Sequence, residues 1–251
     1  MRKLLVLVLV LVFVLAACGG VSQKDRELGE VHQRLAQQSL ASGDTRAALA
    51  EIEKSVEKDP ENPEARNLYG LLLHLYFQRL DAAVVQYRKA IELKPGYSEA
   101  KVNLGAALTA QGRCDEAIPL LDEARGDLLY REPYLAENNL GWCKYKKGDV
   151  EGALMHLRAA VSNNPGFCLG YRNLAEIAQS QGELDDAMRL LERYGKTCPK
   201  EPDADYRLGL VLLEQGKDEA ARRSFLACVE KAKDEELGDE CTRQAAMIPE
   251  G

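Results

Sequence analysis

The sequence predicts an all-α fold: a right-handed solenoid of six helix-turn-helix repeats with a C-terminal capping helix. A small residue recurs in the first helix of each repeat at steps of 34, 35, 36, 34 and 34 residues, at Ala36, Gly70, Gly105, Gly141, Ala175 and Gly209. An alanine of the second helix follows twelve or thirteen residues later, at Ala48, Ala83, Ala117, Ala153, Ala187 and Ala221. Such small residues let paired helices approach closely, and a hairpin that cannot bury its apolar face alone must stack on its neighbours.

The stretch from Ala136 to Pro165 shows one repeat at its clearest. Gly148 marks the turn, and Pro165 stops the second helix because proline lacks an N–H and clashes with the preceding turn. Equivalent turn glycines are Gly43, Gly112, Gly182 and Gly216, and equivalent prolines are Pro60, Pro95 and Pro199. The second repeat has Phe77 in place of its turn glycine, and the third is lengthened around Gly126–Pro133. Register is least defined at those two places.

The N-terminal segment has the pattern of a bacterial export signal, in which Arg2-Lys3 precedes the apolar run Leu4–Val14. The run is short for a transmembrane helix. It ends in Leu15-Ala16-Ala17-Cys18, which resembles a lipobox and implies removal of residues 1–17 and acylation of Cys18. The alternative is an ordinary signal peptide cut after Ala17. Glycine rather than aspartate at position 19 favours the outer membrane, with the protein facing the periplasm.

The rest of the chain follows in order. Residues 18–24 are expected to be the acylated cysteine and a short tether, and residues 25–232 the six repeats, beginning with a helix pair near Arg26–Lys58. Residues 233–251 are expected to form a capping helix and tail, because the end of a solenoid needs a polar outer face. Within this helix one side carries Leu237, Ala245, Ala246 and Met247.

The period near 34 residues resembles the tetratricopeptide repeat (TPR), over roughly residues 25–230. The resemblance implies a groove lined by the first helices that binds other proteins. The charge balance argues against nucleic acid and an anionic membrane surface as partners. Removal of Arg2 and Lys3 with the signal leaves 31 basic and 40 acidic residues, a formal charge of −9 in place of −7. An acidic surface of this kind gives no footprint for nucleic acid and argues against polybasic membrane contact.

Six cysteines follow Cys18, and an even set in an oxidising periplasm indicates disulfides. The repeat positions place Cys114 and Cys143 at one end of the stack, Cys168 and Cys198 at a shared end, and Cys228 and Cys241 on the last repeat and the cap. We therefore expect those three pairs to be bridged. The alternative is that buried free thiols stand in for alanine. No C-x-x-C spacing of a metal or redox site occurs.

Enzymatic activity is not expected. The three histidines, His32, His74 and His156, are far apart and belong to no zinc or triad pattern. Phosphate-binding glycine loops and the common hydrolase motifs are absent from the sequence. We expect no catalytic residue, no metal site and no cofactor apart from the covalent lipid on Cys18.

The predicted groove residues lie at fixed places around each small marker residue. In the second repeat these are Leu68, Leu71 and Leu75, an apolar strip near the tethered end, unless the unusual turn rotates them into the core. Asn103, Asn139 and Asn173 occupy one position in three successive repeats. Such a series either binds the backbone of an extended peptide or is an ordinary feature of the repeat. Interface-forming side chains follow at Trp142, Tyr145, Arg172 and Tyr206.

A lipobox at Leu15–Cys18 combined with six repeats is similar to the pilotin family of type IV pilus biogenesis, the outer-membrane lipoproteins of the PilF and PilW kind. The resemblance implies binding to a pilus secretin monomer, the promotion of its membrane insertion and multimerisation, and a role in twitching or social gliding motility. It also implies paired cysteines between neighbouring central repeats, in agreement with Cys114 and Cys143. The alternative is a TPR scaffold lipoprotein for β-barrel assembly or for peptidoglycan enzymes. Regulation of an enzyme is less favoured, because the chain contains no catalytic domain.

Overall fold

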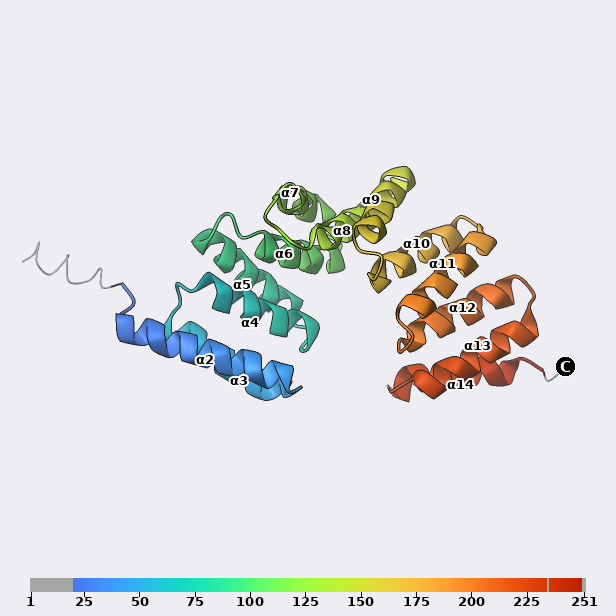
Figure 1. The fold of residues 1–251 in the computed structure, drawn as a ribbon, viewed down its shortest axis with the longest axis horizontal. Coiled ribbons are helices and arrows are strands. Elements are labelled where there is room, and N and C mark those ends of the chain that lie inside the picture. Colours follow the sequence, from blue (N-terminus) through green and yellow to red (C-terminus); the bar gives the residue numbers. More distant parts are fainter. Residues whose placement is uncertain (1–19, 234, 250–251) are drawn as a thin grey trace, which may run out of the picture. The chain divides into compact units, whose positions relative to one another are not determined.

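The computed structural model describes residues 20–233 and 235–249, and all regular secondary structure in this part of the chain is α-helical. Within these residues thirteen helices, α2 to α14, follow one another; α2 to α13 form antiparallel pairs, and α14 follows the last pair (Figure 1). They divide between two compact units, Met1–Ala107 and Leu108–Gly251, with the boundary inside α6. The predicted signal peptide and Cys18 lie outside the described residues.

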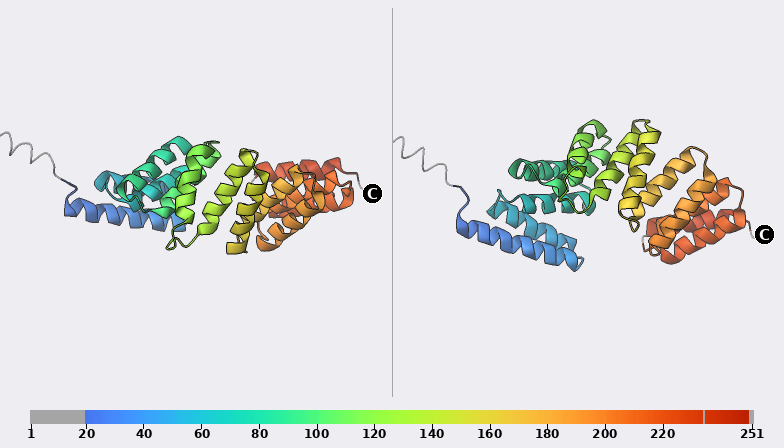
Figure 2. Two further views of the ribbon diagram at one scale, coloured as in Figure 1. Left: turned by 90° about the horizontal axis from the view of Figure 1, so that it is seen from above. Right: turned by 45° about the horizontal axis from the view of Figure 1, so that its top comes forward.

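The N-terminal unit is built from hairpins whose helices pack in sequence order, α2 on α3, α3 on α4 and α4 on α5 (Figures 1 and 2). The bounds are α2 (Gln23–Ala41), α3 (Thr45–Lys58), α4 (Pro63–Leu75), α5 (Leu80–Leu93) and α6 (Ser98–Ala110). Because Ser22 accepts a hydrogen bond from the amide of Asp25 and caps α2, this helix begins inside the segment expected to be a tether.

The C-terminal unit repeats the arrangement, and each helix from α7 to α14 contacts the next one in sequence. The bounds are α7 (Cys114–Arg125), α8 (Pro133–Lys146), α9 (Val150–Asn163), α10 (Cys168–Ser180), α11 (Leu184–Thr197), α12 (Pro202–Glu214), α13 (Asp218–Lys231) and α14 (Glu235–Met247). Contacts between sequence neighbours are what a solenoid is built from.

The turns inside the hairpins depend on one residue with a left-handed backbone. Gly43, for example, has φ +84°, a conformation that is free of strain for glycine alone. In the second repeat the prediction placed Phe77 at this position, but Gln78 is the residue with positive φ, at 51°. The reason is the extra residue of this repeat, which moves the turn one place along the chain.

The small marker residues are small because the partner helix touches them. A Cβ atom at Gly70 would stand 2.6 Å from Cε1 of Tyr87, and one at Gly209 would stand 2.6 Å from Cε1 of Phe225. At Gly141 the added atom would meet Leu157 Cγ at 2.7 Å and the carbonyl oxygen of Ala153 at 3.0 Å. The recurrent glycine is thus a packing requirement of the hairpin.

The capping helix α14 buries only part of the predicted apolar side: Ala245 is buried and Leu237 is half-buried. Cys241 of α14 is buried as well, and so is Ile248, directly after the helix; Ala245 and Ile248 pack with Phe225 of α13. Ala246 and Met247 were expected on the same side, but both are exposed, Met247 by 72%. The buried residues follow the i, i+4, i+7 spacing of one helix face, and positions 246 and 247 lie off that face.

Three disulfides link elements of the C-terminal unit. Cys114–Cys143 joins α7 to α8 with a Cα–Cα distance of 5.3 Å, Cys168–Cys198 joins the two ends of the α10–α11 hairpin, and Cys228–Cys241 joins α13 to α14. These are the pairs expected from the sequence. Disulfides are typical of oxidising compartments outside the cytoplasm.

Candidate functional site

The apolar strip of the N-terminal unit lies on α4, and its three leucines differ in burial. Leu68 packs against the core cluster formed by α2, α3 and α4. Leu71 is half-buried, whereas Leu75, at the end of the helix, is 58% exposed and is followed by Tyr76, 50% exposed. The accessible part of the predicted strip is therefore its C-terminal end, around Leu75 and Tyr76.

His74 lies beside this strip, with its ring edge-on to Tyr87 at a centroid distance of 6.4 Å. Burial lowers the pKa of His74, because the charged imidazolium loses its hydration there. Burial also raises the pKa of Tyr87, and the nearby charge of Glu99 adds to the shift. Both rings are therefore kept neutral, which suits an apolar surface.

The asparagines form hydrogen bonds between successive first helices. Asn103 Nδ2 donates to Asn67 Oδ1 at 3.0 Å, and Asn173 Nδ2 donates to Asn138 Oδ1 at 2.8 Å. Asn173 is only 6% exposed, so its amide serves the packing of α8 against α10. For Asn103 and Asn173 these bonds favour the alternative that the asparagine series is an ordinary feature of the repeat. Asn139 alone has no hydrogen-bond partner among the described residues and remains half-exposed.

An aromatic cluster lies on α8, the first helix of the α8–α9 hairpin. The rings of Trp142 and Tyr145 lie 5.3 Å apart at a tilt of 42°, and the ammonium of Lys146 lies 5.1 Å from the Trp142 ring. Both aromatic side chains are half-buried, so part of each is available to a partner. Aromatic residues in this state combine a large apolar area with a polar tip, which is favourable at interfaces.

The first helices of the next two hairpins, α10 and α12, are instead linked by a network of ion pairs. The N–H of Arg207 Nε is shared between the two carboxylate oxygens of Asp203, at 2.9 and 3.0 Å, and Asp203 also lies 3.3 Å from Arg172 Nε. Arg207 also lies 3.4 Å from Glu176. Tyr206 packs its ring 6.0 Å from that of Phe225. Arg172 and Tyr206 are therefore engaged with their own unit, and Arg172 helps to hold α12 against α10.

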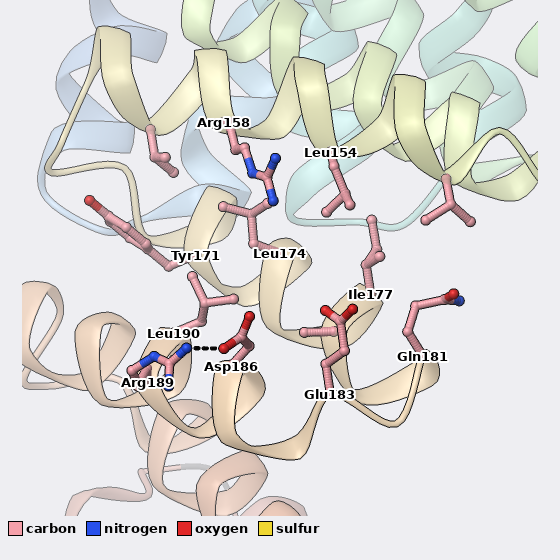
Figure 3. A pocket seen from close by; sticks show the side chains of 13 residues that line it. Leu154, Arg158, Tyr171, Leu174, Ile177, Gln181, Glu183, Asp186, Arg189 and Leu190 are labelled. Atoms are coloured by element: carbon pink, nitrogen blue, oxygen red, sulfur yellow. Dashed lines mark hydrogen bonds and ion pairs between the residues drawn. The ribbon is translucent and has the colours of Figure 1, made fainter.

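A pocket of about 440 Å³ opens between the second helices α9 and α11, with α10 as its floor (Figure 3). Its apolar lining includes Leu154, Leu174, Ile177 and Leu190. Charged groups stand around these apolar residues: Arg158 reaches in from α9, and Glu183 and Asp186 from the start of α11 (Figure 3). Arg189 pairs with Asp186. We refer to this cavity as the α9–α11 pocket.

Sequence reasoning missed the α9–α11 pocket because it considered only the first helices. A signal was present, because Val150, Leu154 and Val161 of α9 are apolar residues that all line the pocket. The same reasoning noticed the lengthened third repeat but drew nothing from Leu128 and Leu129, which are 100% and 89% exposed. Both features belong to the C-terminal unit.

Within residues 20–233 and 235–249, no group of three or more His, Cys, Asp or Glu side chains is arranged to hold a metal ion. None of the described helices has both the length and the hydrophobicity required to cross a membrane. What the structure presents is two protein surfaces of different character, one apolar on α4 and one aromatic on α8.

Comparison with known proteins decides the family. A tetratricopeptide repeat model matches residues 34–97, 103–166 and 172–236, and a second such model matches residues 74–128. The chain belongs to the tetratricopeptide repeat family. Proteins of this family are protein-binding scaffolds that use the extended surfaces formed by their stacked helices.

Curated relatives share the repeat at moderate identity. The TPR repeat-containing protein YpiA of Bacillus subtilis (strain 168) is 26% identical over 210 residues, covering 82% of this chain and 48% of the relative. Protein FlbA of Caulobacter vibrioides is 29% identical over 168 residues, covering 66% of this chain and 27% of the relative. The chain thus spans less than half the length of these relatives.

Two solved structures of similar size resemble the chain over most of its length. PilW, a widely conserved type IV pilus biogenesis factor, is 26% identical with a TM-score of 0.73, covering 84% of this chain and 97% of PilW. PilF of Pseudomonas aeruginosa is 18% identical with a TM-score of 0.66, covering 88% of this chain and 100% of PilF. At that identity the likeness to PilF concerns the TPR fold alone.

Proposed function

We propose that this protein is a lipid-anchored pilotin, which binds the secretin of a type IV pilus and promotes its insertion and multimerisation in the outer membrane. The likeness to PilW carries the proposal, because it covers 84% of this chain and 97% of PilW at 26% identity. A match of nearly the whole of both chains is more specific than a shared repeat, which longer relatives also have.

Two features of the chain support an envelope location. The Leu15-Ala16-Ala17-Cys18 sequence supplies a site for lipid attachment, and three disulfides are typical of a protein that folds in an oxidising compartment. The surface proposed to receive the secretin is the end of α4, where Leu75 and Tyr76 are exposed. A secretin segment destined for the membrane is apolar, and apolar groups exposed to water would be shielded there.

The test is to delete the gene and to analyse the envelope for heat-resistant secretin multimers. We expect the secretin to remain monomeric, pili to be lost, and wild-type protein to restore both. Cys18→Ala is the matched variant, because it removes the acylation site and leaves the sequence of the helical repeats unchanged. We expect this variant to fold, to lack the lipid and to fail to restore multimers at the outer membrane. Normal multimers in the deletion strain would refute the proposal.

A further inference from the structure

The loop between α7 and α8, residues 126–132, presents two leucines to solvent in a fixed turn. Asp127 Oδ1 accepts a hydrogen bond from the amide of Leu129 at 2.9 Å, and the amide of Tyr130 donates to the Asp127 carbonyl at 3.1 Å. Leu128 and Leu129 are 100% and 89% exposed. The loop is therefore an ordered projection with an apolar tip, which we call the leucine loop.

The α9–α11 pocket has the complementary character. Its lining is apolar, and its volume of about 440 Å³ exceeds that of two leucine side chains. Asp186 is neutralised by Arg189, whereas Arg158 and Glu183 have no ion-pair partner among the described residues. The pocket therefore offers an apolar interior flanked by one unpaired cation and one unpaired anion (Figure 3).

We propose that the leucine loop of one copy inserts into the α9–α11 pocket of a second copy of this chain. Leu128 and Leu129 would fill the apolar interior. Asp127 precedes the leucines and Arg131 follows them, so the loop carries an anion and a cation on either side of its apolar tip. Arg131 has no ion-pair partner among the described residues. Asp127 would lie near Arg158 and Arg131 near Glu183.

The surroundings of the loop favour this occupant over a membrane surface. Acidic residues outnumber basic ones beside the leucines: Asp122, Glu123, Asp127 and Glu132, against Arg125 and Arg131. An anionic lipid surface would repel such a loop. The proposed contact joins two different surfaces of the same chain, so it forms either a reciprocal dimer or a head-to-tail series. Its small size places it among weak, transient interfaces. The proposal goes beyond the proposed function and does not rest on it.

The first test places a photo-reactive phenylalanine analogue at position 129 of the full chain, expressed in its own cell envelope. Irradiation should produce a covalent dimer, and mass spectrometry should locate the adduct on α9, α10 or α11 of the partner copy. The same analogue at Met247, which is 72% exposed on α14, is the control and should give no dimer. Adducts from position 129 confined to lipid, to another protein or to a different face of this chain would overturn the proposal.

The second test uses variants of each side of the contact. For the full chain in detergent, we expect Leu128→Glu with Leu129→Glu, and separately Glu183→Arg, to weaken self-association by roughly 100-fold in sedimentation velocity. A mixture of the two variants retains one intact loop and one intact pocket, and should form a one-to-one complex that neither forms alone. Glu183 is exposed on the rim, so its replacement leaves the core unchanged. Wild-type protein that stays monomeric at submillimolar concentration, or variants that associate normally, would contradict the proposal.

The charge pairing has its own check. Arg131→Glu should weaken association as Glu183→Arg does, and the chain carrying both changes should recover most of the wild-type association. Failure of the double variant to recover, with each single variant folded as judged by circular dichroism, would rule out the proposed orientation of the loop in the pocket.

Discussion

His156 Nδ1 lies 2.7 Å from Oε2 of Glu137, and each of these two residues is only 7% exposed. The first repeat contains the same pair in reverse: His32, on the first helix, lies 2.7 Å from Glu51, on the second. His32 and Glu137 each lie four residues before a marker residue, and Glu51 and His156 each lie three residues after a second-helix alanine. The hairpin thus accepts a His–Glu pair in either orientation.

This reciprocity predicts the outcome of a double-mutant cycle. Glu137→His and His156→Glu should each destabilise the protein by about 1–3 kcal/mol, because each leaves a buried polar group without its partner. The double variant should recover more than half of the summed loss. Recovery should be incomplete, because Arg125 lies 3.7 Å from Glu137 and loses this contact. Urea unfolding at neutral pH measures all four proteins, and strictly additive losses would contradict the prediction.

The close packing at Gly141 predicts that alanine has opposite effects at two helical glycines. Gly141→Ala should destabilise by about 1–3 kcal/mol, because the new methyl meets Leu157 Cγ at 2.7 Å and the Ala153 carbonyl oxygen at 3.0 Å. Gly195→Ala on α11 meets nothing closer than 3.7 Å, so the higher helix propensity of alanine should stabilise by up to about 1 kcal/mol. Thermal denaturation of both variants decides this. Equal effects of the same sign would show that backbone propensity, and not contact, governs Gly141.

The Cys114–Cys143 disulfide should stabilise the C-terminal unit by about 2–4 kcal/mol. Its partners are 29 residues apart, compared with 13 for Cys228–Cys241. By loop-closure entropy, loss of the longer loop should cost roughly 0.7 kcal/mol more than loss of the shorter one. Urea unfolding of Cys114→Ser/Cys143→Ser and Cys228→Ser/Cys241→Ser variants gives both values, with helix content at 25 °C expected to stay unchanged. Free thiols at Cys114 and Cys143 in protein isolated from its native cells without reductant would contradict the expectation.

The repeat pattern was sufficient to predict most of the fold. The spacing of Gly70, Gly141 and the second-helix alanines follows directly from close contact between the two helices of a hairpin. The positions of these contacts can therefore be read from the local sequence. The cysteine pairs were also predictable, because the two ends of a hairpin stack are known once the repeats are aligned. The turn at Gln78 was misplaced by one residue, since an insertion can be absorbed at several positions and only packing selects one.

The binding surfaces were less predictable, because residue type does not reveal whether a polar side chain is already satisfied. Arg172 was expected to face a partner, and Asn173 either to do so or to be an ordinary feature of the repeat. Asn173 bonds to Asn138, and Arg172 lies against Asp203. Both contacts join residues about one repeat apart, and no local motif records them. The α9–α11 pocket escaped prediction for a related reason, since it forms only when two second helices stand apart over an apolar floor.

The last prediction separates the binding and packing roles of the α4 leucines. Leu75 is 58% exposed, whereas Leu72, three residues earlier, is fully buried. Leu75→Glu should therefore change the free energy of unfolding by no more than about 0.5 kcal/mol, while Leu72→Ala should cost about 2–5 kcal/mol. If the end of α4 receives the secretin, Leu75→Glu should also abolish secretin multimers in cells although the protein stays folded and membrane-bound.

Val85 provides the matched control for that experiment. It is an apolar residue of the same unit, 54% exposed, and it lies on the second helix α5. Val85→Glu introduces the same charge at nearly the same exposure, so it should leave both stability and secretin multimers unchanged. Equal loss of multimers in the two variants would indicate a general effect of charge. Normal multimers with Leu75→Glu would move the search for the binding surface to Asn139, Trp142 and Tyr145 on α8. There the aromatic side chains are half-exposed, and the Asn139 amide has no hydrogen-bond partner in the described part of the chain.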